Sequence, residues 1–492
     1  MNGMVCNVLC TPPATSGTEI VVIGSGPGGS ITACLLAEAG RDVLLIEEGP
    51  FLPLESCVPF SREEMVQKYR NGGITVTMGQ SKLAYVEGRC VGGGSEINSG
   101  LYLRTPPDIL EEWCRGYQVE SLTEKALQPH FEALEQDLDV SYLPGPAPAA
   151  SLKLHQGAGK LGWKSLEVPR WFRYEPCAPR NTVPHATKQS MSKTFIPRLL
   201  ASGGRLLPNT RAYRLTRHHG RWQVQIAHVA PGRREQRTEI EAETVFIACG
   251  AIQTPALLVR SGIGWNIGKT LQMHPMVKVV AHFPEEVNFP GMGVPVHQVK
   301  EFAPRFSLGC SISTPPYLAL AMTDHPEYIP EVDRHWRHMA VYYAMIRGGR
   351  GTIRNVPMHG DPLVRYGLEQ HDLANLAEAL RKLCQCLYAA GAVSLYPTIL
   401  GSPRLTTEAD VADLPDVLPR GRVNLSAIHL FSSVPMGEDR GRCGTDSFGK
   451  MHEYDNLYIA DGSLLCGPPG VNPQASIMAI ARRNVLKYLG KG

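Results

Sequence analysis

The first apolar positions of the chain fall into two short runs on either side of a glycine-rich stretch. Residues 20–23 are consecutive β-branched residues without a helical period, which predicts a buried strand. A GxGxxG pattern follows, and a helix is expected from about Ser30 to Ala39. A second apolar run, residues 43–46, ends at Glu47. This order predicts a βαβ unit of an α/β fold.

The three glycines of this pattern each have a role in binding a dinucleotide. Gly24 permits a tight turn, Gly26 lets a pyrophosphate approach the backbone, and Gly29 lets the helix pack on the strand. The carboxylate of Glu47 can accept hydrogen bonds from an adenosine ribose, and its charge disfavours the 2′-phosphate of NADP. Dinucleotide binding is therefore favoured over an ordinary βαβ turn, and FAD or NAD over NADP.

A second glycine-rich stretch lies at residues 88–100, with the sequence GRCVGGGSEINSG. Three consecutive glycines are expensive in backbone entropy. We therefore expect a ligand or a neighbouring backbone to approach this stretch closely, in preference to a flexible loop.

The middle of the chain alternates between helical and strand patterns. A helical pattern runs from about residue 105 to 138, with Ser121 and Glu124 as a capping box and Leu127, Phe131, Leu134 and Leu138 on one face. A proline-rich linker follows at residues 143–148. Residues 206–248 have period two and predict successive strands, with turns at 219–220 and 231–232.

Residues 290–425 predict an antiparallel sheet with a helix laid against it. This segment is rich in proline, glycine and aromatic residues, and leucines at helical spacing over 373–387 are followed by Gly391. The last stretch, residues 425–492, has a pattern similar to that of the first, with a buried strand predicted at 457–460. After a Pro/Gly turn, Asn472 is the expected N-cap and Pro473 the first turn of a helix whose N-terminus can stabilise negative charge.

The composition is that of an ordinary globular protein of two domains. The 492 residues include 43% hydrophobic and 19% charged residues with a net charge of +3, and the basic residues are scattered, which argues against nucleic acid. The uncharged runs are broken by glycine and proline, so no membrane span is expected. The 13 cysteines form no CxxC pair and predict reduced thiols of a cytoplasmic protein rather than disulfides or a metal site. The N-terminus does not resemble a secretion signal and is expected to be a disordered or loosely docked tail.

Four motifs together resemble the glucose-methanol-choline (GMC) family of FAD oxidoreductases. They are GSGPGG with IEEG, GRCVGGGSEINSG, GAIQTPALLVRSGIG, and YIADGSLLCGPPGVNPQASIMAIARR, and they occur in the family's order. The GVNP ending is most similar to the cholesterol-oxidase and long-chain-alcohol-oxidase branch. The resemblance implies a discontinuous, Rossmann-like FAD-binding domain and an α+β substrate domain with a large antiparallel sheet. We place a tail at 1–16, the FAD-binding domain at 17–110, 193–290 and 425–492, and the substrate-binding domain at 111–192 and 291–424.

The resemblance also implies which residues form the site. His429 matches the active-site histidine of the family and Asn472 its second active-site residue. The cofactor-binding positions that it implies are Gly24, Gly26, Pro27, Gly29, Ser30, Glu47, Glu48, Arg89, Gly93, Gly94, Ser95, Asn98, Ala212, Asp461, Gly462, Asn472, Pro473 and Gln474. Two positions depart from the family. SSVPMG replaces the usual GTCRMG after the histidine, and Ile97 stands where some members carry a histidine linked to FAD, so a non-covalent FAD is expected.

This site predicts the oxidation of an alcohol to an aldehyde or ketone. His429 would accept the hydroxyl proton, Asn472 would stabilise the alkoxide, and the hydride would pass to flavin N5. Three alternatives stay open: a lyase of the same fold with structural FAD, an NAD-dependent dehydrogenase, and a flavin monooxygenase. If His429 is not the base, His274 is the next candidate.

The sequence leaves several properties of the reaction open. It does not choose among sterol-like, long-chain, benzylic and sugar-type alcohols, and a bulky or sugar-type alcohol of secondary metabolism is one candidate. The aromatic residues at 171–174 and 336–343 are candidates for a pocket, although such residues are more often core. The electron acceptor can be O2 or another oxidant, and the protein a monomer or a homodimer.

Overall fold

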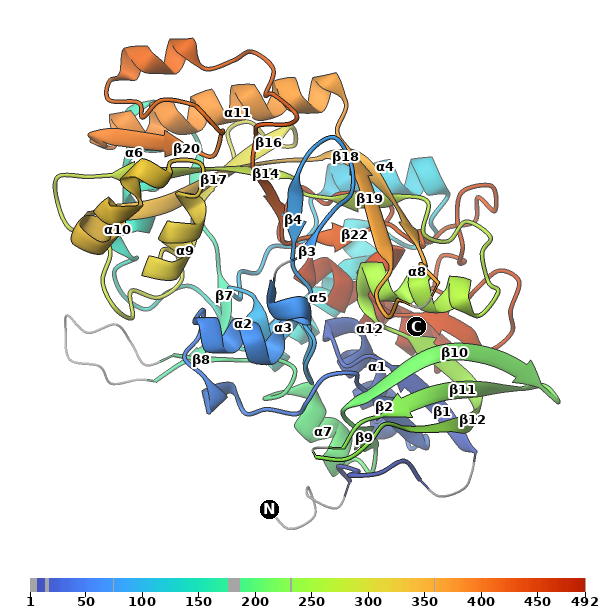
Figure 1. The fold of residues 1–492 in the computed structure, drawn as a ribbon. Coiled ribbons are helices and arrows are strands. Elements are labelled where there is room, and N and C mark those ends of the chain that lie inside the picture. The colour runs from blue at the N-terminus through green and yellow to red at the C-terminus, as the bar shows by residue number, and fades with distance from the viewer. Residues whose placement is uncertain are drawn as a thin grey trace.

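The fold contains two large sheets, one at each end of the view in Figure 1. The computed structural model describes residues 7–13, 17–73, 75–175, 186–230, 232–357 and 359–491. The first sheet lies at the bottom of the view and most of the second at the top, with helix α12 between them and the β3 and β4 strands of the second sheet extending toward the middle.

The first sheet has the Rossmann-like arrangement that the glycine pattern predicted. Its seven strands run in the order β10-β11-β12-β1-β2-β9, and β23 pairs with the end of β12. β1 pairs in parallel with both β2 and β12, and its apolar residues are buried because helices cover the sheet. The bounds are β1 Thr18–Ile23, β2 Val43–Ile46, β9 Arg205–Leu207, β10 Thr210–His218, β11 Arg221–His228, β12 Gln236–Ile247 and β23 Leu457–Ile459.

Helices from several parts of the chain complete the hydrophobic core around this sheet. Helix α1 packs against α7 and α12, and α5 packs against α12. Their bounds are α1 Pro27–Glu38, α4 Pro107–Tyr117, α5 Glu124–Asp137, α7 Phe195–Ala201 and α12 Gln474–Tyr488. Buried residues of α4 and α5 belong to the same core as β1 and β2, whereas the predicted domain division assigns residues 111–192 to the substrate domain. The domain boundaries therefore remain a prediction, and this packing favours assigning α4 and α5 to the first domain.

The second sheet has nine strands in the order β3-β4-β21-β14-β17-β16-β15-β6, with β20 also paired to β14. Alternate residues of β14 face opposite sides: Val277 and Val279 lie in the core beneath α11, and Val280 packs with α9 and α10. The strands are β3 Thr75–Val76, β4 Leu83–Tyr85, β6 Ser165–Glu167, β14 Met276–His282, β15 His297–Val299, β16 Phe306–Cys310, β17 Met339–Ile346, β20 Ser394–Pro397 and β21 Leu425–Ala427. The helices are α6 Ala149–Lys160, α9 Pro315–Ala321, α10 Ile329–His335 and α11 Gln370–Ala389.

Two smaller sheets and three further helices connect these layers. The four-stranded sheet, in the order β19-β18-β13-β22, comprises β13 Leu271–Met273, β18 Gly348–Arg354, β19 Leu363–Gly367 and β22 Leu430–Phe431. The three-stranded sheet comprises β5 Val140–Ser141, β7 Arg170–Tyr174 and β8 Ala186–Lys188. The remaining α-helices of the described chain are α2 Arg62–Lys68, α3 Gly94–Ile97 and α8 Gly250–Arg260.

Three predicted helix starts are wrong in detail. Helix α1 begins at Pro27, earlier than Ser30, because a proline is well tolerated in the first turn. The N-cap of α5 is Thr123, whose hydroxyl accepts a hydrogen bond from the amide of Ala126, and not Ser121. Helix α12 begins at Gln474 with Pro473 at the N-cap position, and the side chain of Asn472 does not cap it. That side chain is therefore available to the site.

Further observations concern the tail, the cysteines and possible membrane or metal sites. Residues 7–13 of the expected tail lie against the first sheet, where Val8 forms a parallel bridge with Leu206. The rest of that tail, and residue 231 of the predicted turn at 231–232, lie outside the described residues. The cysteines of the described chain are all free thiols. No described helix is long and apolar enough to cross a membrane, and no described cluster of His, Cys, Asp or Glu could hold a metal ion.

Candidate active site

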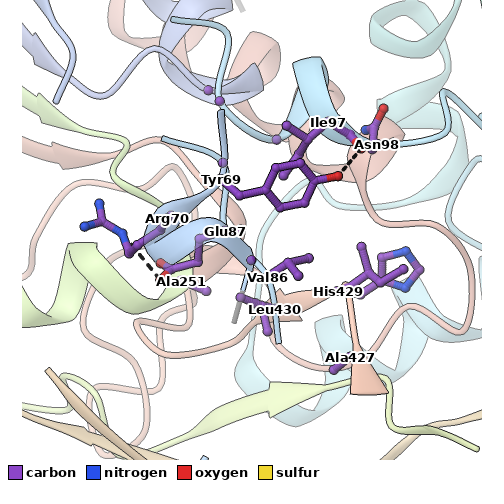
Figure 2. A pocket seen from close by; sticks show the side chains of 18 of the residues that line it. Tyr69, Arg70, Val86, Glu87, Ile97, Asn98, Ala251, Ala427, His429 and Leu430 are labelled. Carbon is purple, nitrogen blue, oxygen red and sulfur yellow. Dashed lines mark hydrogen bonds and ion pairs between the residues drawn. The ribbon is translucent and has the colours of Figure 1, made fainter. Parts of the chain in front are cut away.

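A cavity of 540 Å³ extends from the glycine turn after β1 to the inner face of the second sheet. One end is lined by Gly24, Gly26 and Glu47, and the other by residues of β14, β17 and β21. Figure 2 shows Tyr69 and Ile97 on one side of this cavity and the segment from Ala427 to Leu430 on the other. The cavity therefore joins the predicted cofactor loop to the predicted catalytic histidine.

The glycines of the first loop have the backbone roles that their spacing predicted. Gly24 has φ +100°, and a Cβ there would collide with the carbonyl oxygen of Ala248. A Cβ on Gly29 would collide with the carbonyl of Gly24, so this glycine permits the close packing of α1. A Cβ on Gly26 would meet nothing within 4 Å, because Gly26 faces the cavity. The N-terminus of α1 is thus open to a ligand.

The carboxylate of Glu47 is fixed at the end of β2. One oxygen accepts hydrogen bonds from the amide and hydroxyl of Ser25, at 2.9 and 2.7 Å, and the other accepts one from the amide of Gly49. Burial raises the pKa of Glu47, and these hydrogen bonds oppose that effect. The carboxylate lines the cavity and ties the glycine turn to the strand end.

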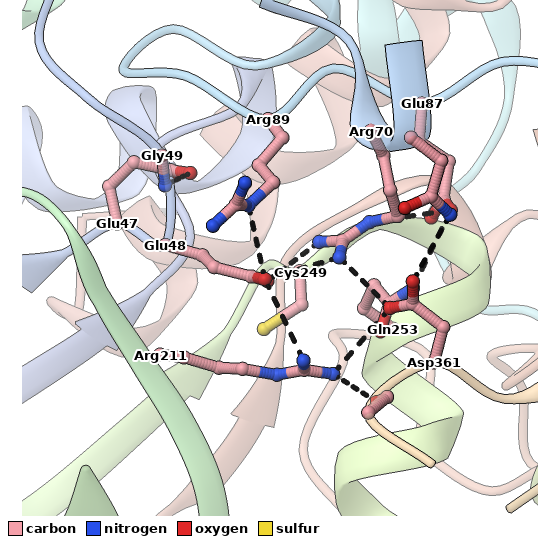
Figure 3. Close-up of polar contacts among 12 residues, drawn as sticks. Glu47, Glu48, Gly49, Arg70, Glu87, Arg89, Arg211, Cys249, Gln253 and Asp361 are labelled. Atoms are coloured by element: carbon pink, nitrogen blue, oxygen red, sulfur yellow. Dashed lines mark hydrogen bonds and ion pairs between the residues drawn. The ribbon is translucent and has the colours of Figure 1, made fainter. Parts of the chain in front are cut away.

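The neighbouring Glu48 belongs to a charge network that joins the two large parts of the fold (Figure 3). Arg70 donates to both oxygens of Glu48 and to Asp361, which follows β18. Arg89 and Arg211 also pair with Glu48. Burial opposes ionisation, but the hydrogen bond and charge of Arg70 lower the pKa of Glu48 to about 2.

Glu87 lies on the other side of Arg70 and lines the same cavity. Burial raises its pKa to about 7, although the charge of Arg70 acts in the opposite direction. Arg70 is therefore shared between an ionised and a weakly acidic carboxyl group.

The second glycine-rich stretch packs directly against the first. Gly93 has φ +53°, and a Cβ there would approach the Cα of Gly26 to 2.8 Å. Asn98 donates a hydrogen bond to the side chain of Gln474 at the start of α12. Three parts of the chain that are distant in sequence thus meet at one wall of the cavity.

Asp461 anchors the fourth motif. One carboxylate oxygen accepts hydrogen bonds from the amide of Gly250 and the hydroxyl of Thr254, at 2.9 and 2.5 Å, and the other from the amide of Ser463. Burial raises the pKa of Asp461 despite these bonds. Asp461 therefore holds the start of α8 beside the end of β23.

His429 and Asn472 lie side by side at the cavity. The Nδ2 atom of Asn472 is 3.4 Å from Nε2 of His429, and its Oδ1 accepts a hydrogen bond from Gln298 at 3.0 Å. Behind His429, the Nδ1 atoms of His274 and His429 are 3.0 Å apart. His274 is completely buried and does not line the cavity.

The hydrogen bonds around His274 determine where the histidines carry their hydrogens. The amide of Gly470 donates to Nε2 of His274 at 3.1 Å, so neutral His274 carries its hydrogen on Nδ1 and donates it to His429. Neutral His429 then carries its hydrogen on Nε2. In this resting state His429 and Asn472 both present N–H donors to the cavity.

Both histidines are neutral over the ordinary pH range. Burial, followed by the positive charge of Lys300, lowers the pKa of His429 to about 4. Burial, and then the charge of His429, lowers the pKa of His274 well below its usual value. The ammonium of Lys300 lies 3.4 Å from the carbonyl of Gly470, next to this pair.

Most of the predicted site residues line this one cavity. Four do not: Gly29 packs α1, Ser30 donates to the carbonyl of Ser25, Ser95 bonds within its own loop and to Met191, and Arg89 pairs with Glu48. Of the aromatic candidates, Tyr343 lines the cavity and Trp171 is buried in the first core.

Sequence reasoning missed several residues at this site. Tyr69, Arg70, Glu87, Lys278 and Gln298 lie in segments without a recognisable motif. Only the lysine had a visible signal, as a charge inside the apolar run MVKVVAH.

Comparisons with known proteins agree with this architecture. Family models described as GMC oxidoreductase match residues 65–276 and 348–481, and one described as an NAD(P)-binding Rossmann-like domain matches residues 22–52. An uncharacterized GMC-type oxidoreductase of Sinorhizobium fredii is 38% identical over 94% of this chain and 93% of its own length. A long-chain-alcohol oxidase of Arabidopsis thaliana is 25% identical over 94% of this chain and 67% of its own.

Solved structures show the same fold at low sequence identity. A pyridoxine 4-oxidase has a TM-score of 0.73 at 18% identity and covers 96% of this chain and 99% of its own. A variant of Aspergillus oryzae formate oxidase has a TM-score of 0.74 at 15% identity, covering 96% and 98%. These likenesses concern the fold.

Proposed function

Because the chain belongs to the GMC oxidoreductase family, whose members depend on FAD, we propose that it oxidises an alcohol to an aldehyde or ketone. Family membership confirms the resemblance inferred from the four motifs. The relatives include long-chain-alcohol oxidases, which supports an alcohol as the substrate. The observation that carries the proposal is the His429–Asn472 pair, which faces the cavity that begins at the glycine turn.

The residues around the cavity fit an FAD. Gly26 and Gly94 leave open space where a Cβ would project, so a pyrophosphate can approach the backbone near the N-terminus of α1. Glu47 is the candidate ribose ligand, and the start of α12, beside Asn98 and Asn472, would face the flavin. FAD bound in this way supplies the hydride acceptor for the reaction.

We propose that the FAD is held without a covalent bond. Ile97 lines the cavity at the position where some family members attach the flavin, and its side chain has no nucleophilic atom. The hydrogen bonds and packing of the glycine loops would then have to provide all of the affinity.

His429 is proposed to take the proton of the substrate hydroxyl. This role requires a free lone pair on Nε2, so the hydrogen of the resting tautomer has to move to Nδ1, toward His274. In that state the hydrogen of neutral His274 is on Nε2, and the amide of Gly470 loses its acceptor. The base role is therefore coupled to a change in the His274–Gly470 contact.

Asn472 is proposed to hold the oxygen that loses this proton. Its side chain is not needed for helix capping, and Gln298 fixes it by donating to Oδ1. The remaining Nδ2 group points toward His429 and the cavity, where it can donate to an alkoxide without competing for the proton.

Anaerobic reduction of the purified holoprotein by a panel of alcohols tests this proposal. Bleaching of the flavin absorbance without NAD(P)H is the expected result. A flavin spectrum unchanged by every alcohol, together with cleavage of a carbon–carbon bond, would instead indicate a lyase. Reoxidation by O2 compared with an artificial dye then identifies the class of electron acceptor.

A further inference from the structure

One lysine lines the substrate end of the cavity without a partner. Lys278 lies in the middle of β14, directly opposite Tyr343 on β17, and both residues line the cavity. Its backbone is fixed by Thr398, which donates to its carbonyl and accepts from its amide. The position of the side chain is therefore set by two neighbouring strands.

No described residue forms a hydrogen bond or ion pair with the ammonium group of Lys278. Asp324, an acidic residue that lines the same cavity, accepts hydrogen bonds from Asn424 at 3.1 and 3.2 Å. Burial alone lowers the pKa of Lys278, and no charged neighbour contributes. An unpaired cation in such a place is unfavourable unless a ligand compensates for it.

Lys278 is also well separated from the catalytic pair. Met276 on β14 is paired with Ser426 on β21, so Lys278 lies further along the sheet, away from His429. At about 3.4 Å per residue, the two backbone positions are roughly 15 Å apart along the strands. The pyrophosphate position at Gly26 lies at the other end of the cavity.

We propose that the substrate is an alcohol that carries an acidic group, a carboxylate or phosphate, which binds Lys278 while its hydroxyl group reaches His429 and Asn472. This inference rests on the proposed oxidation of an alcohol and specifies its substrate class. The acidic group and the hydroxyl lie at opposite ends of the substrate, because the two sites lie apart along the cavity. Apolar residues between them, including Met276 and Ala427, suit a hydrocarbon or aromatic spacer.

The test compares ω-hydroxy carboxylic acids of increasing chain length with their methyl esters. Wild-type holoprotein should oxidise at least one acid with a kcat/KM roughly 10–100-fold above that of its ester, the usual effect of one charge-assisted contact. Lys278→Met should abolish this preference, so that kcat/KM for the acid falls to about that for its ester. Lys278→Arg should retain much of it, and Lys269→Met, which removes an exposed charge, should behave as wild type.

A binding measurement keeps this inference distinct from the proposed function. Simple carboxylic acids without a hydroxyl group should raise the melting temperature of wild type and Lys269→Met but not of Lys278→Met. If the melting temperature rises in this way and no alcohol is oxidised, Lys278 binds an anion but the proposed oxidation is wrong. If alcohols are oxidised but acids and esters behave alike in wild type, the substrate inference is wrong. If Lys278→Met changes the flavin spectrum or reduction potential but not the preference for the acid, the lysine acts on the flavin and does not bind the acidic group of the substrate.

Discussion

Replacing His429 with alanine and with glutamine separates two roles that its position allows. As a base, His429 must accept a proton at Nε2, which neither replacement can do. As a hydrogen-bond donor in the resting tautomer, it offers N–H to the substrate oxygen, and the amide of glutamine can supply a similar donor. The two variants therefore differ in rate only if donation is the main role.

The expected magnitude follows from the base role. A positioned general base contributes roughly 10²–10⁴-fold, so both His429→Ala and His429→Gln should slow anaerobic flavin reduction by that amount while FAD stays bound. The donor role would give a smaller loss in His429→Gln than in His429→Ala, because one hydrogen bond to a developing charge is retained.

The pH dependence gives an independent check on the same residue. With the pKa of His429 lowered to about 4, the neutral form predominates above that pH. The rate constant for reduction should therefore rise with pH through about 4 and then level off. Lys300→Met removes the second cause of the shift, so this inflection should move to higher pH but stay below the ordinary histidine pKa, because burial remains.

Stopped-flow absorbance under anaerobic conditions measures both effects. His429 is not the base if His429→Ala reduces its flavin as fast as wild type or keeps the inflection near pH 4. A rate in His429→Gln within about tenfold of wild type, with a large loss in His429→Ala, would replace the base role with the donor role. In that case another group has to accept the proton.

Three further outcomes follow from the site. Acid precipitation should leave the yellow flavin in the supernatant, and colour in the pellet would show a covalent link despite Ile97. Glu47→Arg should weaken FAD binding and leave the second sheet folded, since the carboxylate of Glu47 holds Ser25 and Gly49 at the turn. A full flavin content in the purified variant would exclude Glu47 as the ribose ligand. Asn472→Ala should slow flavin reduction roughly a hundredfold. It should not reduce the stability of α12, because the side chain of Asn472 does not cap this helix, and circular dichroism would detect any loss of helix.

The parts of the fold that the sequence predicted are those encoded locally. The first βαβ unit follows from consecutive apolar residues and three glycines, two of which would collide with a nearby carbonyl if they carried a Cβ. The leucines of α11 repeat at helical spacing and are buried, and Gly391 has φ +94°. Helix starts were less predictable, because Thr123 and Ser121 are both suitable caps in sequence and only packing distinguishes them.

The active site was predictable only where the family resemblance marked a residue. His429 and Asn472 were identified in this way, and their side chains lie side by side at the cavity, while their roles stay a prediction. Gln298, which donates to Asn472, has no local signal, because this contact depends on the pairing of distant strands. Gly470 lies within the fourth motif, but its contact with His274 depends on loop geometry and is not visible in the sequence. His274 was only the second candidate for the base, and its buried position behind His429, outside the cavity lining, favours a positioning role.

Lys278 shows why a visible sequence signal can still be insufficient. A charge within the apolar run of β14 is unusual, and period two places it on the face opposite Val277 and Val279, away from the core under α11. The sequence cannot tell whether that face meets solvent, an acidic partner or a cavity, because the answer depends on α9 and on the strands that flank β14. The fold supplies that answer: the face lines the same cavity as the catalytic pair. Lys278, which is only an unusual charge in the sequence pattern, is thus the residue that we propose specifies the charge of the substrate.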